Sequence, residues 1–120
     1  MMLMRRIMLK SKIHNARITE TELTYAGSIT IDKNILDASD LLPYERVQVV
    51  NINNGARFET YVIEGEWGNG EICLNGPAAR LGEPGDTIHI LSFATMSVEE
   101  VQHFKPKIVV LGENNTIPEQ

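Results

Sequence analysis

Cysteine is almost absent from this sequence: Cys73 is the only one among 120 residues. A single thiol cannot form an internal disulfide, and no second ligand stands near Cys73 at the spacing of a metal site. A free cysteine in a strand-like segment such as 72–75 is typically a buried structural thiol. We therefore expect no disulfide framework and a reducing, cytoplasmic environment.

Positive charge is also scarce. Lysine and arginine together number 11, against 16 aspartates and glutamates, which gives a net charge of −5. A chain of this balance lacks the basic surface that binds phosphate backbones, so we expect no nucleic-acid partner. A few basic side chains that converge locally could still hold an anionic substrate.

Long hydrophobic runs are missing. The first ten residues, MMLMRRIMLK, resemble the charged start of a secretion signal, but only IML separates Arg6 from Lys10. Three residues are too few for the apolar part of a signal peptide or for a membrane span. We therefore expect neither export nor a membrane partner, and Met2 and Met4 leave the start of translation open.

The common catalytic signatures are absent too. The sequence has no phosphate-binding glycine-rich loop, no G-x-S-x-G elbow and no H-E-x-x-H helix. Its three histidines, His14, His89 and His103, lie far apart in the chain. We interpret each of them as structural or exposed, and we predict no metal site.

What the sequence does contain is the two-residue alternation of half-buried strands. It predicts one domain over residues 1–120, mainly β, a compact barrel with short helices. In the first predicted strand, alternation places Ile13, Asn15 and Arg17 on one face and His14, Ala16 and Ile18 on the other. The predicted strands are 12–18, 28–32, 46–52, 57–63, 72–75, 87–96 and 107–111.

Shorter signals predict the helices and turns. Residues 34–42 have helical spacing, and Pro43 would end that helix. Segment 76–82 is predicted to form one helical turn with Pro77 at its start. Ser97 and Glu100 form the pattern of a capping box for a helix over 97–104. Asn-Gly at 54–55 predicts a hairpin, and the polar tail from Gly112 is expected to fray.

The pair Gly27-Ser28 offers specific chemistry, although Gly-Ser is also an ordinary turn dipeptide. Glycine allows strained dihedrals and leaves its carbonyl open, and the serine hydroxyl is placed to attack that carbonyl. Self-cleavage would require backbone strain, a donor for the developing oxyanion and a route for the proton. Thr60 and Tyr61 would be helpers if the fold brought them close.

Other polar residues lie on elements that could converge: Lys12, His14, Tyr25, Arg57, Thr60, Tyr61 and Asn75. Taken singly, each is ordinary, because strand tyrosines and threonines are favoured for packing and exposed cations are usually solvated.

Taken in order, five segments resemble the pyruvoyl-dependent aspartate 1-decarboxylase family over roughly residues 6–111. They are MLKSKIHNARIT (8–19), YAGSITID (25–32), NNGARFETY (53–61), ICLNGPAARLGEPGD (72–86) and SFATM (92–96). The resemblance implies a double-psi β-barrel and a homotetramer with active sites between subunits. It also implies an inactive proenzyme that cuts itself.

In that family the cofactor is made from the chain. The resemblance implies that Ser28 attacks the Gly27 carbonyl to form an ester and that β-elimination then leaves dehydroalanine at position 28. Hydrolysis with loss of ammonia would yield a pyruvoyl group. The products would be a β chain, 1–27, and an α chain, 28–120, and no pyridoxal phosphate is needed.

The implied reaction converts L-aspartate to β-alanine and CO2 for pantothenate and coenzyme A synthesis, through a Schiff base between the substrate amine and the pyruvoyl ketone. By resemblance, Tyr61 matches the proton donor, Arg57 the residue that holds a substrate carboxylate, and Thr60 the residue that assists processing. Further matches are Lys12 and His14 on a basic strand, Tyr25 and Asn75 in the pocket, and Gly76, Pro77, Ala78 and Ala79 in the loop beside the cofactor.

Two positions depart from the family pattern: Asn15 stands where arginine is usual, and Pro77 where alanine is usual. Proline has no backbone N–H, so a hydrogen bond from that amide would be lost.

Two other functions stay open from the residues alone, an N-terminal-serine hydrolase and a non-catalytic small β-barrel that binds a partner. The need for a maturation helper is also open.

Overall fold

The computed structural model describes residues 4–118. Its strands are β1 (Arg5–Arg17), β2 (Glu20–Glu22), β3 (Ser28–Asp32), β4 (Arg46–Asn51), β5 (Arg57–Gly65), β6 (Ile72–Asn75), β7 (Thr87–Ser97) and β8 (Lys107–Val110). The helices are α1 (Lys33–Ser39) and α2 (Val98–Gln102), with 3-10 turns η1 (Gly76–Arg80) and η2 (Glu113–Asn115). The fold is mainly β with short helices, as the sequence predicts.

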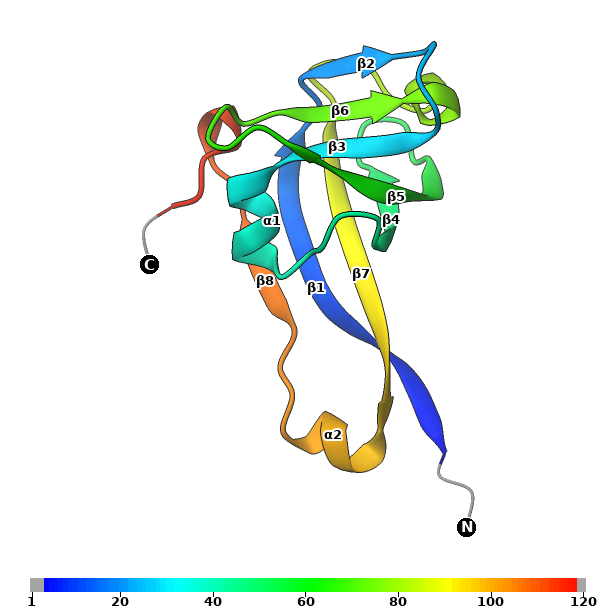
Figure 1. The fold of residues 1–120 in the computed structure, drawn as a ribbon, viewed down its shortest axis with the longest axis vertical. Helices are drawn as coiled ribbons and strands as arrows, with labels where there is room; N and C mark the ends of the chain where they lie inside the picture. Colours follow the sequence, from blue (N-terminus) through cyan, green and yellow to red (C-terminus); the bar gives the residue numbers. More distant parts are fainter. Residues whose placement is uncertain (1–3, 119–120) are drawn as a thin grey trace.

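All eight strands belong to one sheet in the order β2-β6-β3-β5-β4-β7-β1-β8. Parallel pairs (β1 with β8, β2 with β6, β3 with β5) are combined with antiparallel ones, an arrangement consistent with a double-psi β-barrel. The long strands β1 and β7 run antiparallel and continue beyond the barrel as an arm that ends beside α2 (Figure 1). Among the described residues, no helix has the length and apolar character needed to cross a bilayer.

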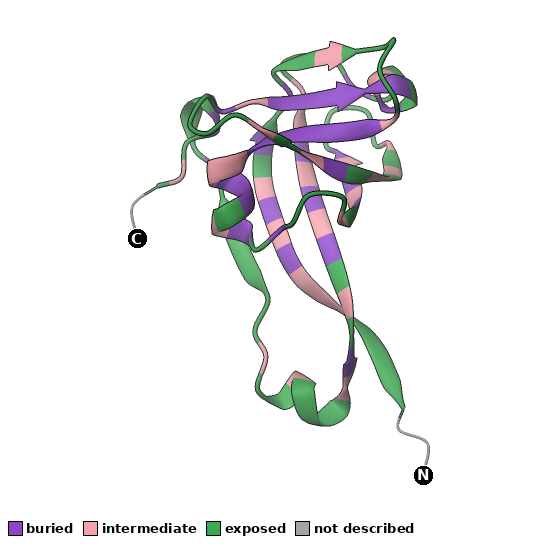
Figure 2. Cartoon of the chain, viewed as in Figure 1, coloured by how far each residue is buried: buried purple, intermediate pink, exposed green. Residues whose placement is uncertain are grey.

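The core lies between the inner faces of the strands. Ile13, Ile90 and Val49 stand opposite one another on β1, β7 and β4, and each is at most 1% exposed. Strand β3 is buried at every position (Figure 2), and both of its edges are paired, with β5 on one side and β6 on the other. Ser28, the first residue of β3, is therefore buried inside the protein and does not lie on a surface turn.

The predicted face pattern of the first strand is wrong. The register between β1 and β7 slips between Ile13 and Ala16, and Asn15 has a φ of 61°. This β-bulge inserts residues without a cross-strand partner and reverses the alternation. Ile13 and Ala16 consequently both point into the core, while Asn15 and Arg17 are exposed.

Helix α1 does not end at Pro43 as predicted. It ends at Asp40, which adopts a left-handed conformation with a φ of 57°. At the other end, Asp32 caps the helix by accepting a hydrogen bond from the Asn34 N–H at 2.8 Å. The helix predicted over 97–104 is present as the shorter α2, with the predicted capping box between Ser97 and Glu100.

The expectation of a frayed tail is wrong for the described residues after Gly112. Residues 119–120 lie outside the described part of the chain, and so does Met2, one of the two alternative start residues. Asn115 is 4% exposed and accepts a hydrogen bond from the Arg17 N–H at 2.8 Å. Its amide donates to the carbonyls of Arg17 and Gly70 at 2.9 and 2.8 Å. One buried asparagine thus attaches η2 to the barrel, a contact that tail polarity does not reveal.

Candidate active site

The Gly27–Ser28 bond lies where a loop enters the buried strand β3. Ser28 is 3% exposed and stands opposite Asn75 in the antiparallel pairing of β3 with β6. The Ser28 hydroxyl donates to the Ala26 carbonyl at 3.3 Å and accepts a hydrogen bond from the Asn75 amide at 2.9 Å. Both interactions hold the hydroxyl oxygen beside the bond that precedes it.

Asn75 is the centre of a buried polar network. Its amide NH2 also donates to the Thr30 hydroxyl at 2.9 Å, and its carbonyl oxygen accepts from the Cys73 thiol at 3.2 Å. Burial, reinforced by nearby carboxylates led by Glu20, raises the pKa of Cys73 to about 11. The predicted burial of Cys73 is confirmed, at 4% exposed.

Gly76 occupies the space directly beside Gly27. It has a φ of 64°, and a Cβ placed on it would lie 2.6 Å from the Tyr25 carbonyl oxygen and 2.8 Å from the Gly27 nitrogen. Real Cβ atoms do not come so close to backbone atoms, so only glycine fits here. The backbones of η1 and of the 25–27 loop are consequently packed against each other.

A small cleft of about 350 Å³ opens over this bond. It is lined by Gly27, Phe58, Glu59, Thr60, Tyr61, Pro77, Ala78 and Leu81. Its volume lies at the lower end of the range for small-molecule sites. The structure therefore brings together Gly27, Thr60, Tyr61, Pro77 and Ala78, with Ser28, Asn75 and Gly76 immediately behind them.

Arg57 and His14 lie elsewhere on the outer face of the sheet. Arg57 stands opposite Val50, and Val50 stands opposite His89, so these three side chains share one face. The Arg57 guanidinium donates to the Gln48 side chain at 2.7 Å. His14 continues the row, because its ring stacks on the His89 ring with centroids 4.0 Å apart.

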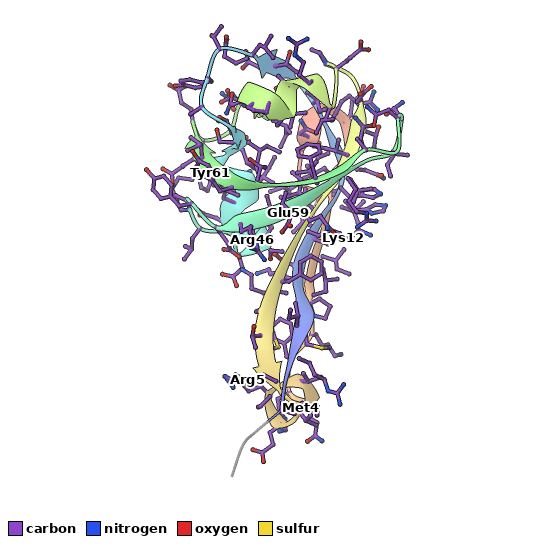
Figure 3. All side chains as sticks on the ribbon, turned by 90° about the vertical axis from the view of Figure 1, so that its right-hand side faces the viewer. Met4, Arg5, Lys12, Arg46, Glu59 and Tyr61 are labelled. Atoms are coloured by element: carbon purple, nitrogen blue, oxygen red, sulfur yellow. The ribbon has the colours of Figure 1, made fainter. Side chains whose placement is uncertain are left out.

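Lys12 belongs to the neighbouring row of the same face. It stands opposite Leu91, which pairs with Gln48, which in turn pairs with Glu59. Figure 3 shows Tyr61 and Lys12 on opposite sides of the barrel end of the molecule, with Glu59 between them. Strands β3 and β1 are four steps apart in the order of the sheet, and the residues that line the cleft do not include Lys12 or His14. Within one chain, Lys12 and His14 do not join the cleft beside Ser28.

Two further predicted residues lie outside the cleft. The Tyr25 side chain is 64% exposed and borders a separate hollow with Thr19, Glu20 and Glu71. Ala79 borders another hollow beside the β4–β5 loop, with Asn53 and Asn54. The backbone carbonyl of Tyr25, in contrast to its side chain, lies against Gly76.

Sequence reasoning missed the pairing of His89 with His14. The Asn15 N–H at the bulge donates to His89 Nδ1 at 3.1 Å, which fixes this nitrogen as an acceptor. Burial, followed by the nearby His14 and Lys12, lowers the pKa of His89. The two histidines are 75 positions apart, so no local pattern signals the contact.

Within residues 4–118, no three side chains of His, Cys, Asp or Glu are grouped to hold a metal.

Comparison with known proteins agrees with these features. Residues 4–118 match the aspartate decarboxylase family. Aspartate 1-decarboxylase of Thermoanaerobacter pseudethanolicus is 59% identical over 112 residues, which cover 93% of this chain and 96% of that protein. Aspartate 1-decarboxylase of Staphylococcus aureus (strain RF122) is 57% identical over 114 residues, which cover 95% of this chain and 90% of that protein. The enzyme of Staphylococcus epidermidis (strain RP62A) is 59% identical over 114 residues, which cover 95% of this chain and 89% of that protein. The chain belongs to the aspartate decarboxylase family.

Proposed function

We propose that this protein removes the α-carboxylate of L-aspartate to give β-alanine and CO2, with a pyruvoyl group made from its own Ser28. The family membership supports the reaction. The observation that carries the cofactor assignment is the buried Ser28 hydroxyl, which accepts a hydrogen bond from Asn75 beside a glycine-only contact at Gly76. β-Alanine would serve pantothenate synthesis, and the free thiol of Cys73 fits a cytoplasmic location.

Self-processing would begin when Ser28 Oγ attacks the Gly27 carbonyl carbon. The Gly27–Ser28 C–N bond breaks as the nitrogen takes up the hydroxyl proton, and an ester replaces the amide. Loss of the Ser28 Cα proton and cleavage of the Cβ–O bond then release the β chain, 1–27, as a carboxylate. Water replaces the nitrogen of the resulting dehydroalanine, ammonia leaves, and the α chain, 28–120, begins with a ketone.

The residues beside the bond suit these steps. Asn75 donates a hydrogen bond to the attacking oxygen, which stabilises negative charge as the proton leaves. Thr60 lines the cleft next to Gly27, and we assign its hydroxyl to assisting the cleavage. Pro77 also borders Gly27 but has no N–H, so it donates nothing to the oxyanion.

Once formed, the pyruvoyl group supplies an electron sink for the carbanion left by CO2. The protein's own side chains orient the substrate and move the proton. Tyr61 lines the cleft and is 36% exposed, so its hydroxyl is accessible to return a proton to the substrate carbon. The Arg57 guanidinium is suited to bidentate binding of a carboxylate, and Lys12 supplies a further positive charge.

We propose that a homotetramer completes each site. Lys12 and His14 lie on β1, four strands from β3 in the sheet order, and neither lines the cleft beside Gly27. A neighbouring copy could place its own β1 beside the cleft. The surface also exposes large apolar side chains, including Ile7, Tyr44 and Ile108, at 76%, 76% and 51%, which would be covered by such contacts.

Denaturing mass spectrometry of the purified chain tests the proposal. We expect two fragments, a smaller one that ends at Gly27 and a larger one that begins at position 28. The larger fragment should resist Edman degradation. The Ser28→Ala variant should stay in one piece. A larger fragment with a free serine amine would indicate the N-terminal-serine hydrolase instead, and an uncut wild-type chain would indicate the binding module or a need for a maturation helper.

A further inference from the structure

We propose that Cys73 is a positioning residue for self-processing: its S–H holds the Asn75 side chain so that the amide NH2, and not the oxygen, faces Ser28 Oγ. This inference rests on the proposed cleavage at Gly27–Ser28 and assigns a role to a residue that takes no part in the chemistry itself.

The contacts form a short buried chain. Cys73 Sγ lies 3.2 Å from Asn75 Oδ1 and 3.9 Å from the Leu74 carbonyl oxygen, so Asn75 is the nearer acceptor. Asn75 Nδ2 lies 2.9 Å from the hydroxyl oxygens of both Ser28 and Thr30. Cys73 and Asn75 are 4% and 1% exposed, which leaves little room for water to replace any of these bonds.

Only Cys73 can select the orientation of the carboxamide. The two ends of an asparagine side chain have nearly the same shape, so hydrogen-bond partners decide which end points where. The hydroxyls of Ser28 and Thr30 can donate or accept and therefore suit either orientation. A thiol donates weakly, but the Oδ1 oxygen is a good acceptor for it, whereas an NH2 group turned toward the sulfur would meet only a weak acceptor. The thiol therefore favours the orientation that turns Oδ1 toward it.

The thiol is also kept in its donor form. Its pKa is raised to about 11, first by burial and then by the carboxylates of Glu20, Glu71 and Glu22. At neutral pH the sulfur therefore carries its proton. A thiolate in this position would lose the hydrogen bond and repel the carbonyl oxygen of Asn75.

The orientation matters for the attacking oxygen. With NH2 toward it, Ser28 Oγ accepts a hydrogen bond and directs its own proton to the Ala26 carbonyl. Negative charge that develops on Oγ during attack then faces a donor. In the reversed orientation the Asn75 oxygen would face Oγ, bind its proton and oppose the charge.

Two substitutions with opposite properties test the inference in the full chain. Cys73→Ser keeps a donor, while Cys73→Val keeps an apolar side chain of similar size and removes the donor. We expect the serine variant to be cut within about twofold of the wild-type rate and the valine variant about fivefold more slowly, since the net contribution of one hydrogen bond corresponds to about that factor. Denaturing mass spectrometry of fresh precursor over time gives both rates.

A purely structural role for Cys73 predicts the reverse order, with valine tolerated and serine harmful. Cutting of Cys73→Val at the wild-type rate would overturn the inference, and an uncut wild-type chain would instead refute the unaided self-cleavage on which it rests. Circular dichroism checks folding, and Cys73→Ala replaces the valine variant if that chain does not fold. In an Asn75→Ala background, the difference between serine and valine at position 73 should disappear.

Discussion

At the scale of single residues, Gly76 is the position where one added methyl group should do most damage. Its Cβ would overlap the Tyr25 carbonyl and the Gly27 nitrogen, and its φ of 64° disfavours other residues. We expect Gly76→Ala to lower the free energy of unfolding by about 3 kcal/mol and to slow cleavage. Urea unfolding of the uncut Ser28→Ala precursor measures the first effect.

Gly68→Ala is the matched control for Gly76. Gly68 has a φ of 89°, but nothing lies within 4 Å of the place where an added Cβ would stand. It therefore bears the backbone cost alone, about 1 kcal/mol. Equal losses from the two substitutions would show that the contact with the 25–27 loop is unimportant.

Tyr61 allows cleavage and turnover to be separated. Its phenol lines the cleft, and we assign it to proton return rather than to processing. Tyr61→Phe should therefore be cut normally while β-alanine formation falls by about 100-fold or more. Tyr44→Phe, whose ring stacks on Tyr61 at 6.3 Å, is the control and should keep its activity. Normal turnover by Tyr61→Phe would remove the assigned role.

His89 should make stability sensitive to acid. Because its pKa is lowered from 6.5 by burial and by His14 and Lys12, the unfolded chain binds the proton more readily than the folded chain. Neutral His89 therefore contributes to the free energy of unfolding above pH 6.5. This contribution is lost as the pH falls from 6.5 through the lowered pKa of the folded chain. Between about pH 7.5 and 5, unfolding of His89→Gln should depend less on pH than that of wild type. The exposed His103→Gln is the control, and identical pH dependence in all three chains would contradict the argument.

At the scale of elements, Asp32 joins a strand, a helix and a loop. Its carboxylate caps α1 at Asn34 and accepts from the backbone N–H groups of Gly68 and Gly70 at 2.8 and 2.7 Å. Asp32 is 2% exposed, so Asp32→Ala would leave three donors without this acceptor. We expect a loss of about 4 kcal/mol in denaturant unfolding.

The control for Asp32 is Asp37→Ala on the same helix. Asp37 is about half exposed and pairs with Lys33 at 3.1 Å, an ion pair of the surface type. Such pairs contribute at most about 0.5 kcal/mol. A similar loss from both aspartates would mean that the bridge to residues 68–70 adds nothing beyond surface charge.

Local pattern predicts most elements well, with bounds that differ by one or two residues for β4, β5, β7 and β8 and agree for β3 and β6. It fails where tertiary pairing decides. Residues 5–11 are not predicted as strand, because they form β1 only by pairing with β7. Strand β2 is missed because ETE has no apolar alternation and forms through parallel pairing with Cys73–Asn75. The β4–β5 hairpin is predicted, but of its Asn-Gly pair only Gly55 has a positive φ.

At the scale of the whole molecule, the proposed site is divided between two places on the sheet. Lys12 lies on β1, and Tyr61 lies on β5 beside the cleft. If neighbouring subunits share sites, Lys12→Ala and Tyr61→Phe chains should each be inactive alone. Co-expressed and mixed at random, they should recover about a quarter of wild-type activity, because some sites receive both native residues.

The mixed assembly needs two checks. Light scattering should give the mass of four chains for wild type and for the mixture. Mixing the two variants only after separate purification and without subunit exchange should give no recovery. Absence of recovery in a verified mixed tetramer would place both residues in the same subunit's site or exclude one of them.

By itself, the amino-acid sequence determined the mainly β class, the strand and helix pattern and the ordered motifs that mark the family, because alternation, caps and motifs are local properties of the chain. The tertiary structure alone decided the bulge at Asn15, the stacking of His14 on His89 and the Cys73–Asn75–Ser28 network. These contacts depend on the register of strands that join distant residues, such as Ser28 and Asn75, which are 47 positions apart. A shift of one residue in that register would turn each side chain to the opposite face.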